Sequence, residues 1–375
     1  MQQHPLRILG LTMERVADFR RHPNAKSSGL YAALDRRYKV TGIVRPAPSQ
    51  FTHYYNKARH FNPNRDVWRT RASLNPWMFK QRTVVAEQQL QQWDGQYDVI
   101  MQLHTILAPG KRAQERRYVI HTDNTYMLSE RYFPEWAPLR GRARAEWLAM
   151  ERETYQRAAF LFPRSEFLRQ SMIQDYGCHP DRVIRVGGGS NFPVVSLENK
   201  RYDTQTALFV GSDFERKGGM ALLQAWEMVR HALPDAQLWI VGPKRSYGES
   251  RPGIHWHGFV SDRQAVAQMY QQATAFVMPS LFEPWGHVFF EAMSNGLPCI
   301  GSDRGATPEI VQHGQTGLLV PPGEPEPLAD ALIALLGNPA QAEALGRAAH
   351  ADVAHGHTWD DVVSRMAPYL EQIGS

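Results

Sequence analysis

The sequence predicts an α/β protein with two doubly wound domains, each built on a parallel sheet. Short apolar or β-branched runs alternate with longer amphipathic segments along the chain, which is the pattern of βαβ units. This pattern breaks once, at a stretch with three consecutive glycines in 186–206, and then begins again. The length of 375 residues also exceeds what one hydrophobic core usually organises.

The elements follow from this alternation. The segment 219–232 is typical of the expected helices, because Leu222, Leu223, Trp226 and Val229 recur at helical spacing. We expect an N-terminal domain at 1–190, a C-terminal domain at 191–357, and a last helix at 358–375 that crosses back to the N-terminal domain. The expected strands are 7–11, 40–44, 98–103, 118–121, 159–162, 183–186, 207–210, 237–241, 275–278, 298–300 and 317–320.

Composition excludes several classes of protein. With 43% hydrophobic and 21% charged residues, the chain is neither disordered nor collagen-like. No run approaches the ~20 apolar residues of a membrane span, and the first residues lack the pattern of a secretory signal. Cys178 and Cys299 are too few for a disulfide framework and lack metal-ligand spacing. We therefore expect a cytoplasmic protein with two free thiols.

Charge is divided unevenly along the chain. Residues 1–200 hold 31 Lys and Arg against 18 Asp and Glu, whereas the remainder holds 11 against 19. A basic half indicates an anionic partner, such as lipid at the inner face of a membrane, although a solvated surface explains it equally well. No nucleic-acid-binding signature is present. The basic excess gathers at Arg20, Arg21, Lys26, Arg36, Arg37, Lys39, Arg140, Arg142 and Arg144, the last three after Tyr132, Phe133 and Trp136.

The segment 280–296 carries the sharpest chemical signal. It follows an apolar strand, bends at Pro284 and Gly286, and continues as a helix from His287 that ends at Asn295-Gly296. A helix that begins here directs the backbone N–H groups of Gly286, His287 and Val288 toward a ligand. Such a helix start is suited to bind an anion, for example a phosphate.

Two glutamates flank this bend. Glu291 lies in the expected helix, where its carboxylate can accept hydrogen bonds from two adjacent hydroxyls, as on a ribose. Glu283 precedes the bend, within reach of a sugar beside the phosphate. A Glu-x7-Glu spacing alone is weak, but its position across a strand–turn–helix junction is uncommon.

These residues resemble the Glu-x7-Glu signature of the retaining glycosyltransferase family 4, which has the GT-B fold. The run that follows, LPCIGSDRGATPEIVQHGQTGLLV, is similar to the family's Pro-Glu-Ile/Leu-Val and Gly-x-Thr-Gly motifs. The resemblance implies two Rossmann-like domains that face each other across a cleft. It also implies that the C-terminal domain binds a nucleotide sugar.

A second segment, LFVGSDFERKGG at 208–219, resembles the family's phosphate-binding loop. By this resemblance Gly211 and Ser212 lie at the donor. Arg216 and Lys217 together neutralise the departing diphosphate, and Lys217 is the preferred candidate for this role. The strand 237–241 resembles the one whose end, at Gly242, lies near the nucleotide base.

In the N-terminal half, the stretch YVIHTDNTY at 118–126 resembles a strand that directs a histidine at the donor sugar. His121 is the candidate, with Asp123 nearby. His104, which also follows an expected strand, is the alternative. In place of the family's Gly-Gly loop the chain has Ser27-Ser28-Gly29, which offers N–H groups at a helix start.

The resemblance implies a retaining transferase that moves a sugar from a UDP- or GDP-sugar to an acceptor hydroxyl of a cell-surface glycan or glycolipid. No Asp-x-Asp triplet that would hold a divalent metal occurs, so we expect neither a metal nor another cofactor. Two alternatives stay open. One is a GT-B sugar-nucleotide epimerase or hydrolase, and the other is a non-catalytic protein that binds a nucleotide sugar or a glycan.

Overall fold

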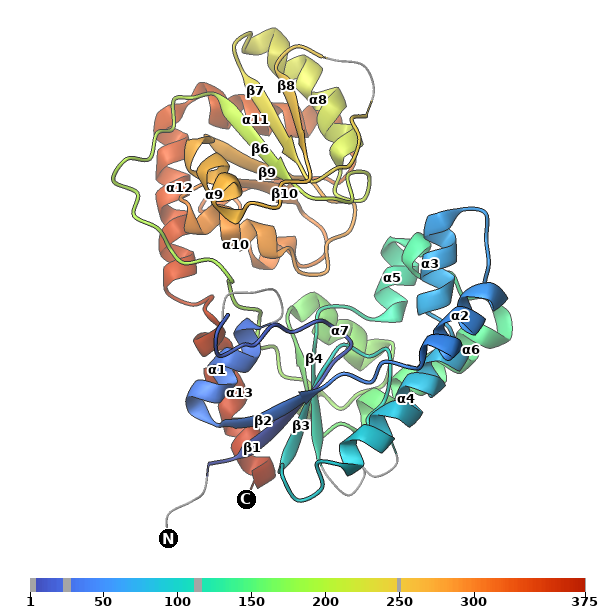
Figure 1. The fold of residues 1–375 in the computed structure, drawn as a ribbon. Helices are drawn as coiled ribbons and strands as arrows, with labels where there is room; N and C mark the ends of the chain where they lie inside the picture. The colour runs from blue at the N-terminus through green and yellow to red at the C-terminus, as the bar shows by residue number, and fades with distance from the viewer. Residues whose placement is uncertain (1–4, 23–27, 111–116, 248–250, 375) are drawn as a thin grey trace. The chain divides into compact units, whose positions relative to one another are not determined.

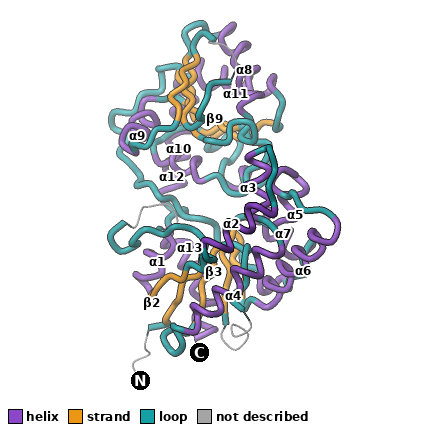
Figure 2. Tube along the Cα trace, turned by 45° about the vertical axis from the view of Figure 1, so that its right-hand side comes forward, coloured by secondary structure: helices purple, strands orange, loops and turns teal. Residues whose placement is uncertain are grey.

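The computed structural model describes residues 5–22, 28–110, 117–247 and 251–374. The chain divides into two compact units (Figure 1). Unit 1 comprises Met1–Gly189 together with Trp359–Ser375, and unit 2 comprises Ser190–Thr358. Figure 2 shows the strands of each unit as a separate group enclosed by helices. Both units are therefore layered α/β structures.

Unit 1 contains a five-stranded sheet in the order β2-β1-β3-β4-β5, and all neighbouring strands are parallel. Every residue of β3 and β4 is buried, as expected when helices cover both faces of a parallel sheet. The strands are β1 (Arg7–Leu11), β2 (Lys39–Val44), β3 (Val99–Leu103), β4 (Tyr118–Thr122) and β5 (Phe160–Pro163).

Side-chain caps set the start of several helices in this unit. Asn75, Thr125 and Ser165 each accept a hydrogen bond from a backbone N–H of the following turn. The C-terminal helix packs against α1 and β3, where Trp359 and Met366 enter the core of the unit. The helices are α1 (Gly29–Arg37), α2 (Gln50–Arg59), α3 (Arg65–Ser73), α4 (Pro76–Gln91), α5 (Tyr126–Tyr132), α6 (Gly141–Arg157), α7 (Glu166–Gln174) and α13 (Trp359–Gly374).

Unit 2 contains a six-stranded parallel sheet in the order β11-β10-β9-β6-β7-β8. Its core joins the strands to α8 and α11, which pack against each other, and to α10, which packs against α12. The strands are β6 (Thr206–Val210), β7 (Gln237–Val241), β8 (Ile254–Gly258), β9 (Ala275–Met278), β10 (Cys299–Ser302) and β11 (Gly317–Val320), and the helices are α8 (Gly219–Ala232), α9 (Arg263–Gln272), α10 (His287–Ser294), α11 (Pro325–Gly337) and α12 (Pro339–Ala354).

The prediction of two parallel α/β sheets is confirmed. Four strands, β1, β7, β9 and β11, have the expected bounds. The expected strand at 183–186 does not form as a regular strand: Val183 forms a parallel bridge to Leu161, and the N–H groups of Ile184 and Val186 donate to Leu161 O and Pro163 O of β5. The reason is that this segment continues as the irregular connection between the units. Within the described residues, no helix is both long and apolar enough to cross a membrane.

Candidate functional site

In unit 2 the carboxyl ends of β6 and β7 meet at two glycines. The Gly211 N–H donates to Val241 O at 2.8 Å. Gly242 has a φ of +115°, and a Cβ there would lie 2.6 Å from the Gly211 carbonyl carbon. Only glycine fits this approach, because the backbones leave no room for a side chain. The two strand ends therefore present bare backbone, beside the exposed Ser212.

Lys217 lies directly over Gly211. A Cβ on Gly211 would be 2.3 Å from Lys217 Cδ, and the ammonium donates to Val210 O at 3.5 Å. Burial lowers the pKa of Lys217, and the neighbouring Arg216 lowers it further, while Glu283 and Glu291 oppose the shift. A partly buried ammonium over glycine backbone is suited to receive a phosphate.

Arg216 is buried and ties two loops together. Its Nε donates to Asp213 Oδ2 at 2.9 Å, and its Nη1 donates to Phe282 O at 2.7 Å and to Glu283 Oε2 at 3.3 Å. Its carbonyl accepts from Leu281 N–H at 2.8 Å. The sequence analysis gave Arg216 and Lys217 one shared cationic role. The structure separates them, since the guanidinium holds the loop that carries Glu283.

Glu283 closes the turn before α10. It is 8% exposed, and its Oε1 accepts from the Gly286 N–H at 3.1 Å. Gly286 has a φ of +71° and caps α10. The Gly286 N–H that the sequence analysis offered to an anion therefore already binds Glu283. His287 and Val288, both half-buried, form the first turn of the helix.

Glu291 lies on α10, half-buried, and its Oε2 accepts from the Tyr270 hydroxyl at 3.1 Å. Burial raises the pKa of Glu291 to about 7, against the opposing effects of Tyr270, Arg263 and Lys217. The carboxyl group is thus balanced between its protonated and ionised forms near neutral pH. It can accept hydrogen bonds from hydroxyl groups when ionised.

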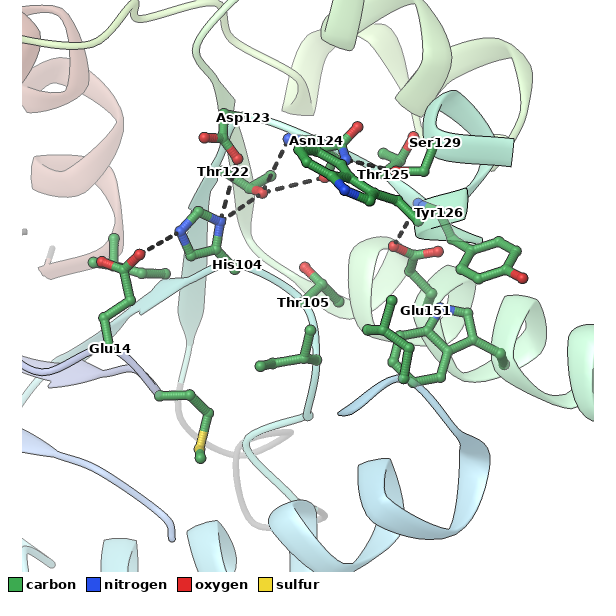
Figure 3. A pocket seen from close by; sticks show the side chains of 16 residues that line it. Glu14, His104, Thr105, Thr122, Asp123, Asn124, Thr125, Tyr126, Ser129 and Glu151 are labelled. Carbon is green, nitrogen blue, oxygen red and sulfur yellow. Dashed lines mark hydrogen bonds and ion pairs between the residues drawn. The ribbon is translucent and has the colours of Figure 1, made fainter. Parts of the chain in front are cut away.

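Unit 1 holds a pocket of about 380 Å³ at the carboxyl ends of β3 and β4 (Figure 3). Its lining combines the carboxyl groups of Glu14, Asp123 and Glu151 with the aromatic side chains of Trp136 and Trp147. The lining residues are Met13, Glu14, Leu74, Leu103, His104, Thr105, Ile106, Thr122, Asp123, Asn124, Thr125, Tyr126, Ser129, Trp136, Trp147 and Glu151. Carboxylate, amide and hydroxyl groups beside aromatic rings are the chemistry that recognises a sugar.

His104 is the central polar residue of this pocket (Figure 3). Its Nε2 lies 3.3 Å from Glu14 Oε1, and its Nδ1 lies 3.4 Å from Asp123 Oδ1 and 3.4 Å from Thr122 Oγ1. Burial opposes protonation, but Asp123 and Glu14 outweigh it and raise the pKa of His104 to about 9. Its φ of +58° is unusual for a residue with a side chain. Such backbone strain gathers at functional sites.

His121 lies elsewhere. It is fully buried in β4, where its Nδ1–H donates to Phe162 O at 2.9 Å and its Nε2 accepts from Arg164 Nε at 3.3 Å. Burial, together with the charge of Arg164, holds the pKa of His121 well below its usual value. His121 does not line the pocket, and His104 does. His104 is thus the histidine of the pocket and His121 lies behind it in β4, while a donor-facing role for either histidine stays a prediction.

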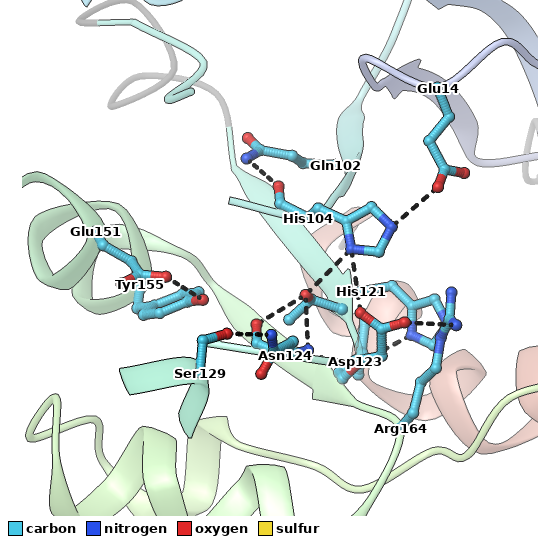
Figure 4. Close-up of polar contacts among 12 residues, drawn as sticks. Glu14, Gln102, His104, His121, Asp123, Asn124, Ser129, Glu151, Tyr155 and Arg164 are labelled. Atoms are coloured by element: carbon cyan, nitrogen blue, oxygen red, sulfur yellow. Dashed lines mark hydrogen bonds and ion pairs between the residues drawn. The ribbon is translucent and has the colours of Figure 1, made fainter. Parts of the chain in front are cut away.

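A chain of contacts links the two histidines (Figure 4). Arg164 binds His121 through Nε, and its Nη1 lies 3.2 Å from Asp123 Oδ2, while Asp123 contacts His104. Glu14 and Arg164 were not predicted from the sequence as site residues. Both follow strands, β1 and β5, so the rule that ligands gather at the carboxyl ends of parallel strands would have found them.

The pocket also has a buried acid. Glu151 accepts hydrogen bonds from the Tyr176 hydroxyl at 2.6 Å, from the Tyr155 hydroxyl at 3.2 Å and from the Tyr126 N–H at 3.2 Å. Burial raises the pKa of Glu151 to about 7. Because Tyr126 is the first residue of α5, this carboxyl group fixes the helix that lines the pocket.

Two of the residues singled out from the sequence, Lys26 and Ser27, lie outside the described residues. Ser28 precedes α1, but its side chain makes no cap hydrogen bond, so only its backbone contributes to the helix start. In the described ranges, no group of three or more His, Cys, Asp and Glu side chains is arranged to hold a metal ion.

Comparison with known proteins finds glycosyltransferases. Residues 204–338 match the family model "Glycosyl transferases group 1". The chain is 34% identical over 179 residues to a phosphatidyl-myo-inositol mannosyltransferase of Mycobacterium leprae, covering 46% of the chain and 47% of that protein. A D-inositol 3-phosphate glycosyltransferase of Jonesia denitrificans is 28% identical over 250 residues, 59% of each protein. The matches thus span about half the length of these curated relatives.

Solved structures extend the likeness to the whole chain. Sucrose-phosphate synthase from Thermosynechococcus elongatus superimposes with a TM-score of 0.70 at 19% identity, covering 98% of the chain and 99% of that structure. Anabaena HepE, solved in complex with UDP and glucose, gives a TM-score of 0.64 at 16% identity, with 99% and 100% covered. The described chain has the two-domain GT-B fold of these proteins.

Proposed function

Since the chain belongs to the group 1 glycosyltransferase family, we propose that it transfers a sugar from a nucleoside diphosphate sugar to an acceptor hydroxyl. The observation that carries this proposal is the arrangement of Glu283 and Glu291 around the Gly286 turn, beside Lys217. The relatives support it, because HepE was solved with UDP and glucose. A UDP- or GDP-sugar is the donor that we propose.

Each donor group has a proposed partner in unit 2. Lys217 and the first turn of α10 at His287 and Val288 meet the diphosphate, where negative charge grows as the sugar leaves. Glu291 binds the ribose hydroxyls. Glu283, fixed by Arg216 and the Gly286 N–H, orients the transferred sugar. Because these cations and N–H groups supply positive potential, we propose that transfer requires no metal or cofactor.

We assign the pocket of unit 1 to the acceptor. Its carboxylates Glu14 and Asp123 can accept hydrogen bonds from sugar hydroxyls, and Trp136 offers an apolar face. In the transfer step, the bond between the sugar and the diphosphate breaks, and the acceptor oxygen bonds to the anomeric carbon. We propose retention by attack on the same face, with the leaving phosphate oxygen taking the hydroxyl proton. Positioning and charge stabilisation then supply the catalysis.

The finer assignments are proposals as well. The acceptor that we propose is a glycan or a glycolipid, and the name of the Mycobacterium leprae relative, phosphatidyl-myo-inositol mannosyltransferase, supports a lipid-linked one. We also propose that the protein works in the cytoplasm, with peripheral contact at the inner face of the membrane. Both cysteines are free and buried, which suits a reducing compartment.

A donor screen tests the proposal. UDP-, GDP- and ADP-sugars are compared by thermal shift, and a donor present at ~100 times its Kd should add about 2.7 kcal/mol of stability. Mass spectrometry then detects the transfer product, proton NMR of the new linkage reports retention, and a chelator tests the metal requirement. Absence of both binding and product would contradict the proposal. Turnover of the donor without acceptor would instead indicate an epimerase or a hydrolase.

A further inference from the structure

Helix α2 exposes an aromatic stripe. Phe51, Tyr54 and Tyr55 are spaced i, i+3 and i+4, so they share one helix face, and they are 80%, 66% and 50% exposed. Phe61, just after the helix, is 67% exposed, and its ring lies 5.7 Å from that of Trp68 on α3. An aromatic stripe at helical spacing is normally buried. We call these four exposed residues, Phe51, Tyr54, Tyr55 and Phe61, the α2–α3 surface.

The inward side of α2 is polar. Asn56 is buried, and its Nδ2 donates to Ala72 O at 2.6 Å, while Asn75 Nδ2 donates to Asn56 Oδ1 at 3.1 Å. Trp68 Nε1 donates to Lys57 O at 2.8 Å. These hydrogen bonds fix α2 against α3 with the aromatic stripe outward. Helices α2 and α3 lie on the side of unit 1 away from α1 and α13 (Figure 1).

The chain around this surface is strongly basic. Residues 45–82 contain eight Lys and Arg and a single acid, Asp66. Arg59, Arg65 and Arg71 are exposed. In the part of the chain that the structure describes, none of these three arginines has a carboxylate within ion-pair distance. Their charge is therefore not neutralised by neighbouring side chains.

The basic clusters singled out from the sequence differ because several of their arginines form ion pairs. Arg20 pairs with Asp35 at 2.8 Å, Arg36 with Asp360 at 2.8 Å and Arg37 with Glu371 at 3.0 Å. Arg144 pairs with Glu130 at 2.6 Å. These ion pairs stay within unit 1, so much of the charge of those clusters is already satisfied.

We propose that the α2–α3 surface docks on an anionic lipid bilayer. Aromatic side chains lie at the boundary between headgroups and acyl chains, and surrounding arginines and lysines are attracted to anionic headgroups. The two phenylalanines carry no polar atom that would bind a sugar hydroxyl, and acidic side chains are nearly absent here. The surface thus fits a lipid boundary better than a glycan.

This inference rests on the membrane contact proposed above and locates it on the chain, and its test needs no turnover, so that it can fail while the proposed transferase activity stands. Vesicles of phosphatidylcholine, with and without phosphatidylglycerol, are mixed with the full chain and separated by flotation. The chain should float only with the anionic vesicles. Raising the salt from about 0.1 M to 1 M, which shortens the Debye length from about 10 Å to 3 Å, should release most of it.

Variants locate the contact. The double variant Phe51→Ser/Phe61→Ser should bind anionic vesicles at least about tenfold more weakly, and Arg59→Glu/Arg65→Glu should do the same. The matched control is Phe259→Ser, an equally exposed phenylalanine (74%) on unit 2, which should bind like the wild type. All the replaced side chains are exposed, so circular dichroism melts should agree among the variants.

Two results would overturn the proposal. One is a wild-type chain that does not float with anionic vesicles. The other is a Phe51→Ser/Phe61→Ser variant that floats as well as the wild type. If this variant instead loses affinity for a soluble glycan while vesicle binding is unchanged, the surface belongs to the acceptor and the lipid proposal is wrong.

Discussion

Replacing Glu283 with Ala removes the acceptor of two hydrogen bonds. The buried Gly286 N–H loses its partner, which costs about 1–3 kcal/mol. Arg216 loses one partner of a buried ion pair, for which about 3–5 kcal/mol is typical. Arg216 keeps Asp213 Oδ2 at 2.9 Å and Phe282 O at 2.7 Å, so only part of that cost applies. We expect unit 2 to lose about 3 kcal/mol.

Calorimetry measures this loss. At about 2–4 °C per kcal/mol for a domain of this size, the transition of unit 2 should fall by about 6–12 °C. The matched control is Glu291→Gln. Glutamine keeps an oxygen for the Tyr270 hydroxyl and has no charge to bury, so its transition should be unchanged or higher. A Glu283→Ala protein that melts with the wild type would refute the role of Glu283 in the loop.

Activity is then compared at a temperature at which the melt shows each variant fully folded. Under this condition Glu283→Ala should still lose donor turnover, because the sugar is no longer oriented. Full turnover by the folded variant would remove Glu283 from the donor site. The stability measurement is needed because the same carboxylate holds the loop and is proposed to face the sugar.

Three further substitutions test other parts of the site. His104 has a pKa near 9 in the fold and an ordinary value of 6.5, so it stabilises unit 1 below about pH 6.5, and this contribution is lost as the pH rises through 9. His104→Gln should lack that loss in chemical denaturation, and an unchanged pH profile would contradict the ion contacts. Glu151 acts over a lower pH range: burial raises its pKa from 4.5 to about 7, so the fold loses stability as the pH rises from 4.5 through 7. Glu151→Gln should flatten this decline, whereas a decline as steep as in the wild type would assign it to other groups. In Gly211→Ala the new Cβ displaces the flexible Lys217 side chain, so nucleoside diphosphate affinity should fall about tenfold (1.4 kcal/mol) with little change in melting temperature, and unaltered affinity would argue against Lys217.

The fold was accessible from the sequence because its signals are local. Strands such as β7 and β9 are short apolar runs between helical segments, and the turn at Gly286 is encoded by Pro284 and the glycine itself. The segment 183–186 has the same apolar character, yet it forms a single bridge at Val183 and two backbone hydrogen bonds to β5, from Ile184 and Val186, without becoming a strand. Strand pairing depends on the position of a partner, which a local run does not contain.

The candidate site could be predicted from the sequence less completely than the fold. Motifs located Glu283, Arg216 and Lys217, but the different roles of Arg216 and Lys217 depend on the loop at Phe282, far along the chain. Two histidines lie near the ends of expected strands, and the sequence does not show which of their side chains lines the pocket. His121 lies within β4 and is covered by Trp359 from the C-terminal helix, a contact across more than 200 residues that no local pattern encodes.

The sequence also does not show which surface charges are paired and which aromatic side chains are exposed. Several arginines of the clusters predicted from the sequence are paired in the structure, such as Arg36 with Asp360 and Arg37 with Glu371 of α13. The aromatic stripe of α2 would be assigned to the core by its spacing, and only the buried Asn56 shows that the helix faces the other way. Burial and charge pairing are properties of the folded chain.

Titration of a nucleoside diphosphate and of its parent nucleoside into wild-type, Lys217→Met and Glu291→Gln proteins tests the central claim most directly. Calorimetry should show that Lys217→Met weakens only the diphosphate, by about tenfold or 1.4 kcal/mol, because the nucleoside lacks the phosphates. Glu291→Gln should weaken both ligands by a similar factor, because both contain the ribose. Equal affinities for all three proteins, or a loss in Lys217→Met that is the same for the nucleoside, would contradict a diphosphate held by Lys217 and a ribose held by Glu291.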